Sequence, residues 1–290
     1  MFGFLNIYKP QGKTSHDAVA ILRRITKIKQ IGHTGTLDPF AEGVLPICIG
    51  KATRLIEYLK DNKAYKGIVQ LGVSTTTYDI EGERVNVSDK SVSLEEIEKA
   101  LNSFKGEIEQ TPPIYSAIKV RGKKLYEYAR EGKEVDIQAR RVNIKEIKVL
   151  NYDAEKRQLE LYISCSKGTY IRSVANDLGE KLGTYGHLIK LIRVQAGDFL
   201  IDNSIKLERL ENAQVVEQHL IKPTQFLDYQ KYELNSIELE KVSHGMDFEP
   251  DLNRNTLPLK NETIILTKDE ELIAVGEVKE DRIKCNKVFI

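Results

Sequence analysis

The sequence of 290 residues has no tryptophan, two methionines and three cysteines. The cysteines, Cys48, Cys165 and Cys285, are an odd number at wide spacing and include no CxxC pair. This pattern argues against a disulfide framework and favours free thiols in a reducing cytoplasm. The five histidines are scattered in the same way, with no two at the spacing of metal ligands. We therefore expect no metal site.

Long apolar runs are also missing from the chain. No hydrophobic stretch approaches the ~18 residues that a membrane-spanning helix needs. The first residues, MFGFLNIYKPQGK, lack the basic start, the long apolar run and the small-residue cleavage site of a signal peptide. With 41% hydrophobic and 30% charged residues, the composition is that of a soluble globular protein. We expect a cytoplasmic protein that does not contact a membrane.

The net charge of +1 conceals an uneven distribution. Residues 1–75 hold 11 Lys and Arg against 5 Asp and Glu, and residues 112–195 hold 17 against 10. The two segments between and after them are acidic, with 4 against 9 in residues 76–111 and 10 against 16 in residues 211–290. Two basic segments are typical of a nucleic-acid-binding face, although an unevenly charged, solvated surface would give the same counts.

Strands outnumber helices in the predicted order of elements. Ser15 is expected to be the N-cap of a helix that runs through about Ile28. Ser93 and Glu96 form a capping box at the start of a second helix, and Gly183 is expected just past the end of a third. The predicted strands follow one another in sequence, which favours an α+β fold with a largely antiparallel sheet over a doubly wound one.

The pattern of predicted elements changes near residues 227–232. From about residue 229 the chain reads as one short helix and then short strands joined by acidic turns. We therefore predict two domains, residues 1–228 and a small β-rich domain of residues 229–290.

The stretch GHTGTLDPFAEGVLP, residues 32–46, is the most informative part of the chain. Its glycines permit close approaches of the backbone, and Asp38 is biased to an extended conformation because Pro39 follows it. An extended aspartate between glycine-rich turns and an apolar strand can present its carboxylate at the mouth of a cleft. The ordinary alternative is a turn aspartate that bonds its own backbone, and the residues alone leave both readings open.

One apparent nucleotide-binding motif fails on inspection. The segment QGKTS resembles the end of a P-loop, but that motif needs glycine at position 7, where the chain has Ile7. The glycine-rich cradle for phosphates is absent, so we do not expect an ATPase.

The central stretch, extended to GHTGTLDPFAEGVLPICIGKATR, resembles the central motif of the TruB-type tRNA pseudouridine synthases. Other blocks of that family are matched in the expected order by KPQGKTSHDAV, YKGIVQLG, TYDIEG, QTPPIYSAIKVRGKKLYEYAREG and CSKGTYIRSVANDLGEKLG. The last sixty or so residues look like a PUA-type RNA-binding module. The resemblance implies a catalytic domain built on a mixed, largely antiparallel sheet flanked by helices, followed by a PUA-like domain.

The resemblance also implies the reaction, which is the isomerisation of one T-loop uridine of tRNA, at tRNA position fifty-five, to pseudouridine. This reaction breaks the N1–C1′ bond and rejoins the uracil through C5, so it needs no cofactor. The aspartate of the family's G-[TA]-L-D-P run is the nucleophile, which places that role on Asp38. Attack on C1′, addition to the uracil ring and a glycal route all remain open.

The same family match assigns further site residues. Arg172 corresponds to the arginine that pairs with the aspartate, and Tyr65 to the active-site tyrosine that stacks on the everted uracil. Tyr170 and Leu191 match positions that line the base pocket, and Asp79 matches a further polar position. Without the motif, each of these residues would be read as a surface arginine or as ordinary packing.

The family match extends to residues that contact RNA outside the base pocket. His33 matches a histidine that fills the space left by extruded bases. Six basic residues are expected to screen phosphates without reading sequence: Lys119, Arg121, Lys123, Lys124, Arg140 and Arg141. They lie in residues 112–141, where the family has an RNA-binding insertion that we expect to be mobile without substrate.

Two other functions remain open from the sequence. The first is the catalytic subunit of a guide-RNA-dependent synthase of the dyskerin type, against which the short C-terminal module and the lack of a Lys-rich tail argue. The second is a non-catalytic protein that helps tRNA to fold, against which the intact set of family residues argues. We expect a monomer.

Overall fold

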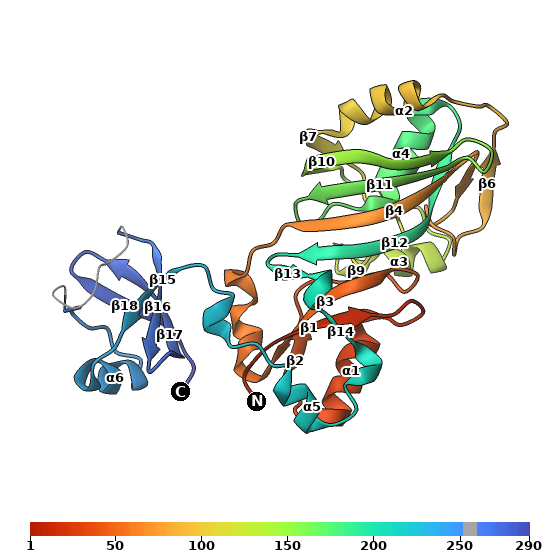
Figure 1. Cartoon of the computed structure of the whole chain (residues 1–290). Coiled ribbons are helices and arrows are strands. Elements are labelled where there is room, and N and C mark those ends of the chain that lie inside the picture. The colour runs from red at the N-terminus through yellow and green to blue at the C-terminus, as the bar shows by residue number, and fades with distance from the viewer. Residues whose placement is uncertain (252–259) are drawn as a thin grey trace.

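The computed structural model describes residues 1–251 and 260–290. Its largest unit is a ten-stranded sheet, and a separate four-stranded sheet forms the C-terminal part of the molecule (Figure 1). The two termini lie close together at the junction of these parts, where the rings of Phe2 and Phe289 stack with centroids 5.5 Å apart. Across the described ranges, no helix is both long and apolar enough to cross a membrane.

The main path of the large sheet has the order β14-β1-β3-β12-β4-β11-β10-β7. Its strands are β1 (Gly3–Lys9), β3 (Glu42–Ile49), β4 (Lys63–Leu71), β7 (Gly106–Gln110), β10 (Arg140–Asp153), β11 (Gln158–Cys165), β12 (Gly186–Ala196) and β14 (Ile205–Lys206). Two short strands join its side, β2 (Ile31–His33) on β3 and β13 (Phe199–Leu200) on β12. All pairs are antiparallel except β1 with β14 and β12 with β3. The predicted α+β fold with a largely antiparallel sheet is therefore confirmed.

The burial of each strand follows its place in the sheet. In β11, buried and partly exposed residues alternate along the whole strand, as expected when one face packs against helices and the other approaches solvent. In β3, by contrast, seven consecutive residues are buried. This strand is covered on both faces, which explains why VLPICIG reads as an almost continuous apolar run.

The helices pack against the large sheet in two groups. Residues of α2 (Leu94–Leu101) and α4 (Ile171–Leu182) share a buried cluster with β10 and β11. Residues of α1 (Ser15–Thr26) and α5 (Ala213–Gln218) pack against β1 and β3. The packing of α4 on β12 is especially close, because a Cβ at Gly179 would lie 2.2 Å from the backbone nitrogen of Gly186.

The first helix begins one residue away from the predicted cap. Thr14, not Ser15, is the N-cap, and its side chain accepts a hydrogen bond from the backbone N–H of Asp17 while the Asp17 side chain closes a capping box. The helix also ends at Thr26, two residues before the predicted end, because Lys27 adopts a left-handed conformation. The prediction of Ser15 as the cap was wrong, and its hydroxyl is free to bond elsewhere.

The other predicted helix ends are confirmed. Ser93 caps α2 and forms the capping box with Glu96. Gly183 follows α4 with φ +69, the left-handed conformation that favours glycine. The segment Gly50–Tyr58 forms a 3-10 helix, η1.

Two small hairpins project from the large sheet. The first pairs β5 (Val73–Thr75) with β6 (Arg84–Val87), and the second pairs β8 (Lys119–Val120) with β9 (Lys123–Lys124) and leads into α3 (Leu125–Arg130). The loop of the first hairpin carries Asp79, and the second lies in the predicted insertion.

The C-terminal sheet has the order β15-β16-β17-β18. It consists of β15 (Gln230–Glu233), β16 (Thr263–Lys268), β17 (Glu271–Lys279) and β18 (Arg282–Val288), with α6 (Ser236–Ser243) beside it. Its core is separate from that of the large sheet, but Val275 and Phe289 join a cluster that also contains Phe4. Lys51 and Arg54 of η1 donate hydrogen bonds of 2.7 and 2.9 Å to the carbonyls of Phe289 and Val288. The domain boundary near residue 228 stays a prediction.

Candidate active site

Asp38 lies in the loop between β2 and β3. The backbone N–H of Ala41 donates to its carbonyl at 3.1 Å, and the preceding residue, Leu37, is buried with 3% exposure. The Asp38 side chain is 33% exposed. The loop thus anchors its apolar residue in the core and leaves the carboxylate accessible.

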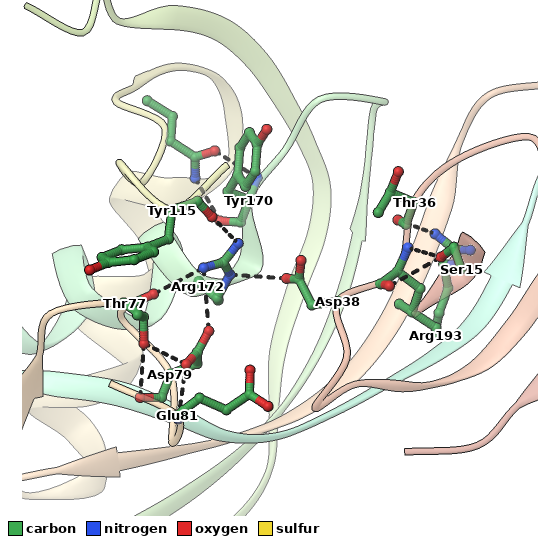
Figure 2. Close-up of polar contacts among 12 residues, drawn as sticks. Ser15, Thr36, Asp38, Thr77, Asp79, Glu81, Tyr115, Tyr170, Arg172 and Arg193 are labelled. Atoms are coloured by element: carbon green, nitrogen blue, oxygen red, sulfur yellow. Dashed lines mark hydrogen bonds and ion pairs between the residues drawn. The ribbon is translucent and has the colours of Figure 1, made fainter. Parts of the chain in front are cut away.

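Arg172, in the first turn of α4, lies against Asp38 (Figure 2). Its Nε is 3.0 Å from Oδ2 of Asp38, and its Nη1 is 3.3 Å from Oδ2 of Asp79. The guanidinium also donates to two backbone carbonyls, those of Thr77 at 3.1 Å and Tyr115 at 2.9 Å. With 6% exposure and four partners, this side chain joins the Asp38 loop, the β5–β6 hairpin and the predicted insertion.

Asp79 is the buried member of this group, with a side-chain exposure of 4%. Burial raises the pKa of its carboxyl, while the Thr77 hydroxyl, which donates to it at 2.5 Å, and the Arg172 guanidinium act in the opposite direction. Its other hydrogen bond comes from the backbone N–H of Glu81. Asp79 thus holds the far side of the guanidinium whose near side faces Asp38.

Tyr65 and Leu191 line the neighbouring part of the site from adjacent strands. In the register of β4 with β12, Tyr65 lies opposite Arg193, and Leu191 lies opposite Gly67. Tyr65 and Leu191 share one buried cluster with Leu37. Burial raises the pKa of Tyr65 to about 12, so its hydroxyl keeps its proton at neutral pH.

Tyr170 is the residue immediately before α4. Its backbone is held by Gln110 in both directions, because the Tyr170 N–H donates to Oε1 at 2.8 Å and Nε2 of Gln110 donates to the Tyr170 carbonyl at 3.0 Å. Burial raises the pKa of the Tyr170 hydroxyl, and the negative charge of Asp38 adds to this effect. Tyr170 is therefore fixed at the start of α4, two residues before Arg172.

His33 ends β2, five residues before Asp38, and is outside the group of ion pairs. Burial lowers the pKa of its imidazole, and the positive charges of Arg193 and His16 act in the same direction. The ring is therefore neutral at pH 7, which suits stacking and wedging more than phosphate binding.

The six predicted phosphate-binding residues lie on two elements. Lys119, Arg121, Lys123 and Lys124 belong to the β8–β9 hairpin and its turn, and Arg140 and Arg141 begin β10. The ammonium of Lys123 lies 5.0 Å from the ring centroid of Tyr128 and pairs with Glu131, so part of its charge is already compensated. The ammonium of Lys124 likewise lies 5.3 Å from the ring centroid of Tyr126.

Three residues near the site were missed by the sequence analysis: Ser15, Gln110 and Arg193. Gln110 ends β7 and is buried with 2% exposure, and no local motif distinguishes it from a surface glutamine. Arg193 has 0% exposure, although it stands in a strand where a charged residue would ordinarily face solvent. Ser15 was assigned to the wrong role.

The site offers two carboxylates, two tyrosines and two guanidinium groups. Within residues 1–251 and 260–290, no three His, Cys, Asp or Glu side chains gather closely enough to bind a metal ion. Such a set suits nucleophilic or acid–base chemistry at a carbon centre.

Comparison with known families matches most of the chain. Residues 23–171 match the family described as "TruB family pseudouridylate synthase (N terminal domain)", and residues 172–237 match the "tRNA pseudouridylate synthase B C-terminal domain". A relative named tRNA pseudouridine synthase B from Caldanaerobacter subterraneus subsp. tengcongensis is 41% identical over 99% of both chains. A second relative of that name, from Staphylococcus aureus strain MSSA476, is also 41% identical over 99% of both chains.

Solved structures agree with this at the level of the fold. A chain of a Cbf5–Nop10–Gar1 complex is 24% identical with a TM-score of 0.73, and the match covers all of this chain and 85% of the other. A chain of an H/ACA RNP bound to a substrate RNA containing 2′-deoxyuridine is 23% identical with a TM-score of 0.72 and the same coverage.

Proposed function

Because this chain belongs to the TruB family of pseudouridylate synthases and is a tRNA pseudouridine synthase, an isomerase, we propose that its substrate is the T-loop uridine at tRNA position fifty-five. We propose that it acts alone as a monomer in the cytoplasm and recognises the T-stem-loop without a guide RNA. Relatives at 41% identity over nearly the full length support the stand-alone reading over a guide-dependent one.

One observation carries the proposal for the site. Asp38 is partly exposed on one side and lies 3.0 Å from a buried guanidinium on the other. The guanidinium holds one carboxylate oxygen, Oδ2, in place, and the exposed side leaves the carboxylate free to approach a sugar or base. Arg172 in turn is held by Asp79 and by backbone carbonyls, so it cannot easily turn away from Asp38.

The chemistry assigns each of these groups a task. In the proposed mechanism the Asp38 carboxylate is the nucleophile that assists cleavage of the N1–C1′ bond, and it is released when C5 of the turned uracil bonds to C1′. The proton lost from C5 is balanced by one gained at N1, so the product is an isomer of the substrate. Tyr65 and Leu191 hold the detached uracil between them while it turns. Because the pKa of Tyr65 is about 12, we assign its ring to stacking and its protonated hydroxyl to the path of the departing C5 proton.

Binding of the RNA is assigned to residues outside this pocket. His33 fills the space left by the everted nucleotide, and eversion costs a few kcal/mol that contacts in the pocket offset. The six basic residues screen phosphates, and residues 112–141 close over the stem-loop. We further propose residues 1–228 as the catalytic domain and residues 229–290 as a PUA-like RNA-binding domain.

A tritium-release assay tests this function. A T-stem-loop transcript carrying tritium at C5 of its uridines is mixed with the purified chain and no other RNA. We expect stoichiometric release of tritium from one uridine. Release that occurs only after a guide RNA is added would support the guide-dependent alternative and overturn the stand-alone reading.

A further inference from the structure

Arg193 is a fully buried arginine that the ion pairs of the site do not explain. It lies on β12 beside Tyr65, and its exposure is 0%. An arginine stays charged in proteins, so burying it is costly unless its donors are satisfied. The groups that satisfy it therefore indicate what it does.

The Arg193 guanidinium bonds to backbone carbonyls on both sides of Asp38. Its Nη2 donates to the carbonyl of Gly35 at 3.1 Å and its Nη1 to that of Thr36 at 3.2 Å, both before Asp38 in the chain. Its Nε donates to the carbonyl of Val44 at 2.7 Å, after Asp38. One rigid, planar group thus connects the two ends of the loop that presents the carboxylate.

Ser15 holds the same loop at Leu37, the residue before Asp38. Its Oγ accepts a hydrogen bond of 2.8 Å from the N–H of Leu37 and donates one of 3.1 Å to the Leu37 carbonyl. Ser15 is 2% exposed and belongs to α1, so it fixes the backbone at Leu37 to a helix. Figure 2 shows Ser15 and Arg193 on the side of Asp38 away from Arg172.

The backbone of Arg193 restricts the loop as well. Gly43 has φ +110, and a Cβ there would lie 2.3 Å from the Arg193 carbonyl oxygen. The end of the loop is therefore packed against the main chain of β12 while the side chain of the same residue holds its carbonyls.

We infer that Arg193 and Ser15 are positioning residues that together clamp the loop of residues 35–44 and fix the place of Asp38. This inference rests on the proposed function. The clamp leaves the carboxylate itself to Arg172 and acts on the backbone that carries it. Arg193 also lies beside Tyr65, so the hydrogen exchange of residues 35–38 is the readout that is specific to the loop. A displacement of a reacting group by about 1 Å can cost on the order of 10²-fold in rate, so a clamp of this kind affects turnover more than RNA binding.

The test uses Arg193→Lys in the full-length chain. Lysine keeps the positive charge, but one ammonium cannot span three carbonyls. Tritium release is measured with the enzyme in excess over RNA, and the single-turnover rate constant is determined at rising enzyme concentrations. This rate constant reaches a maximal value, the plateau, when the enzyme is saturating. The plateau does not depend on the fraction of enzyme that is folded. A variant that only folds less well would therefore keep the same plateau and would need a higher total enzyme concentration to reach it. We expect the plateau to fall by roughly 10²-fold while the Kd for the stem-loop stays within about threefold.

Arg157→Lys is the matched control. Arg157 also donates to two backbone carbonyls, those of Ser88 and Asp89, at 2.7 and 3.1 Å, but far from the Asp38 loop in the structure. We expect its plateau to equal that of the wild type. Ser15→Ala is the second test, with an expected loss of about tenfold, and combining it with Arg193→Lys should cost less than the product of the two because both act on one loop.

Two results would overturn the inference. One is a plateau for Arg193→Lys, or for Ser15→Ala if the former does not fold, within twofold of wild type. The other is unchanged amide hydrogen exchange at residues 35–38 in the folded variant, a readout that needs no turnover. An inactive wild type would instead contradict the proposed function, and the exchange measurement would still decide the clamp.

Discussion

The two sides of Asp38 are built from different chemistry around the same functional group. On one side, the guanidinium of Arg172 faces the carboxylates of Asp38 and Asp79. On the other, the guanidinium of Arg193 bonds to three neutral backbone carbonyls and lies beside Tyr65, whose hydroxyl it also approaches. The comparison teaches that a buried arginine can hold either a carboxylate or the backbone that carries it, according to what its donors bind.

Both sides meet at the carboxylate, so its removal should have the largest effect. We expect Asp38→Asn to lower turnover by 10⁴-fold or more, because an amide cannot replace a nucleophilic carboxylate, while binding of the stem-loop stays near that of the wild type. Tritium release and filter binding measure the two properties. Asp61→Asn, which removes an exposed carboxylate paired with Lys167, is the control and should be fully active. Substantial turnover by Asp38→Asn would remove the nucleophile from the mechanism.

Substitution of Arg172, which contacts the two carboxylates, should have the next largest effect on turnover. Arg172→Lys keeps one charge but cannot reach two carboxylates and two carbonyls, so we expect roughly a 10³-fold fall in the single-turnover rate. This loss should exceed that of Arg193→Lys, since only Arg172 contacts the reacting carboxylate. The opposite order of the two losses would mean that position matters more than charge at this site.

The neutral side can be tested through Tyr65. In Tyr65→Phe the ring that stacks on uracil is kept and the hydroxyl is lost, so RNA binding should be unchanged and turnover should fall by about 10²-fold. Tyr152→Phe, which removes a hydroxyl bonded to the Val92 carbonyl far from the site, serves as the control. A rate for Tyr65→Phe close to that of the wild type would remove the hydroxyl from the path of the proton.

The smallest expected effect concerns the pH dependence of stability. Burial raises the pKa of Asp79 in the folded state. Between the carboxyl pKa of the unfolded chain and that of the folded protein, the native state therefore binds more protons. Through that pH range this group makes the free energy of unfolding fall as the pH rises. We expect Asp79→Asn to weaken that fall and to lower turnover by about tenfold, because Arg172 loses one of its anchors.

Asp177→Asn separates these two effects. Burial also raises the pKa of Asp177, which lies on α4 without contacting Arg172. Thermal unfolding between pH 4 and 7 should show a smaller decrease of stability with rising pH in both variants than in the wild type. Only Asp79→Asn should lose turnover. Equal rates for the two variants would show that Asp79 does not act through Arg172.

The chemistry of the Arg172 side could be predicted from the sequence, and that of the Arg193 side could not. Asp38, Asp79 and Arg172 stand in segments whose residue types and order are specific to the family. Arg193 stands in KLIRVQAG, where a charged residue in an alternating strand predicts a solvated face. Its inward orientation results from the place of β12 between β3 and β4, which no local pattern contains.

Ser15 shows the same limit on a smaller scale. Two neighbouring residues, Thr14 and Ser15, are both good caps, and sequence rules cannot choose between them. The choice is made by Leu37, 22 residues further along the chain, which bonds the Ser15 hydroxyl and leaves capping to Thr14.

The sequence by itself determined the family and the α+β class, because each depends on residue types at short range: motif residues in a fixed order, capping residues at helix ends, and the alternation of strands. Only the tertiary structure decided which distant groups surround Asp38. Hydrogen bonds and ion pairs need atoms about 3 Å apart, and the pairing of β12 with β3 and β4 brings Gly35 and Arg193, 158 residues apart, to that distance.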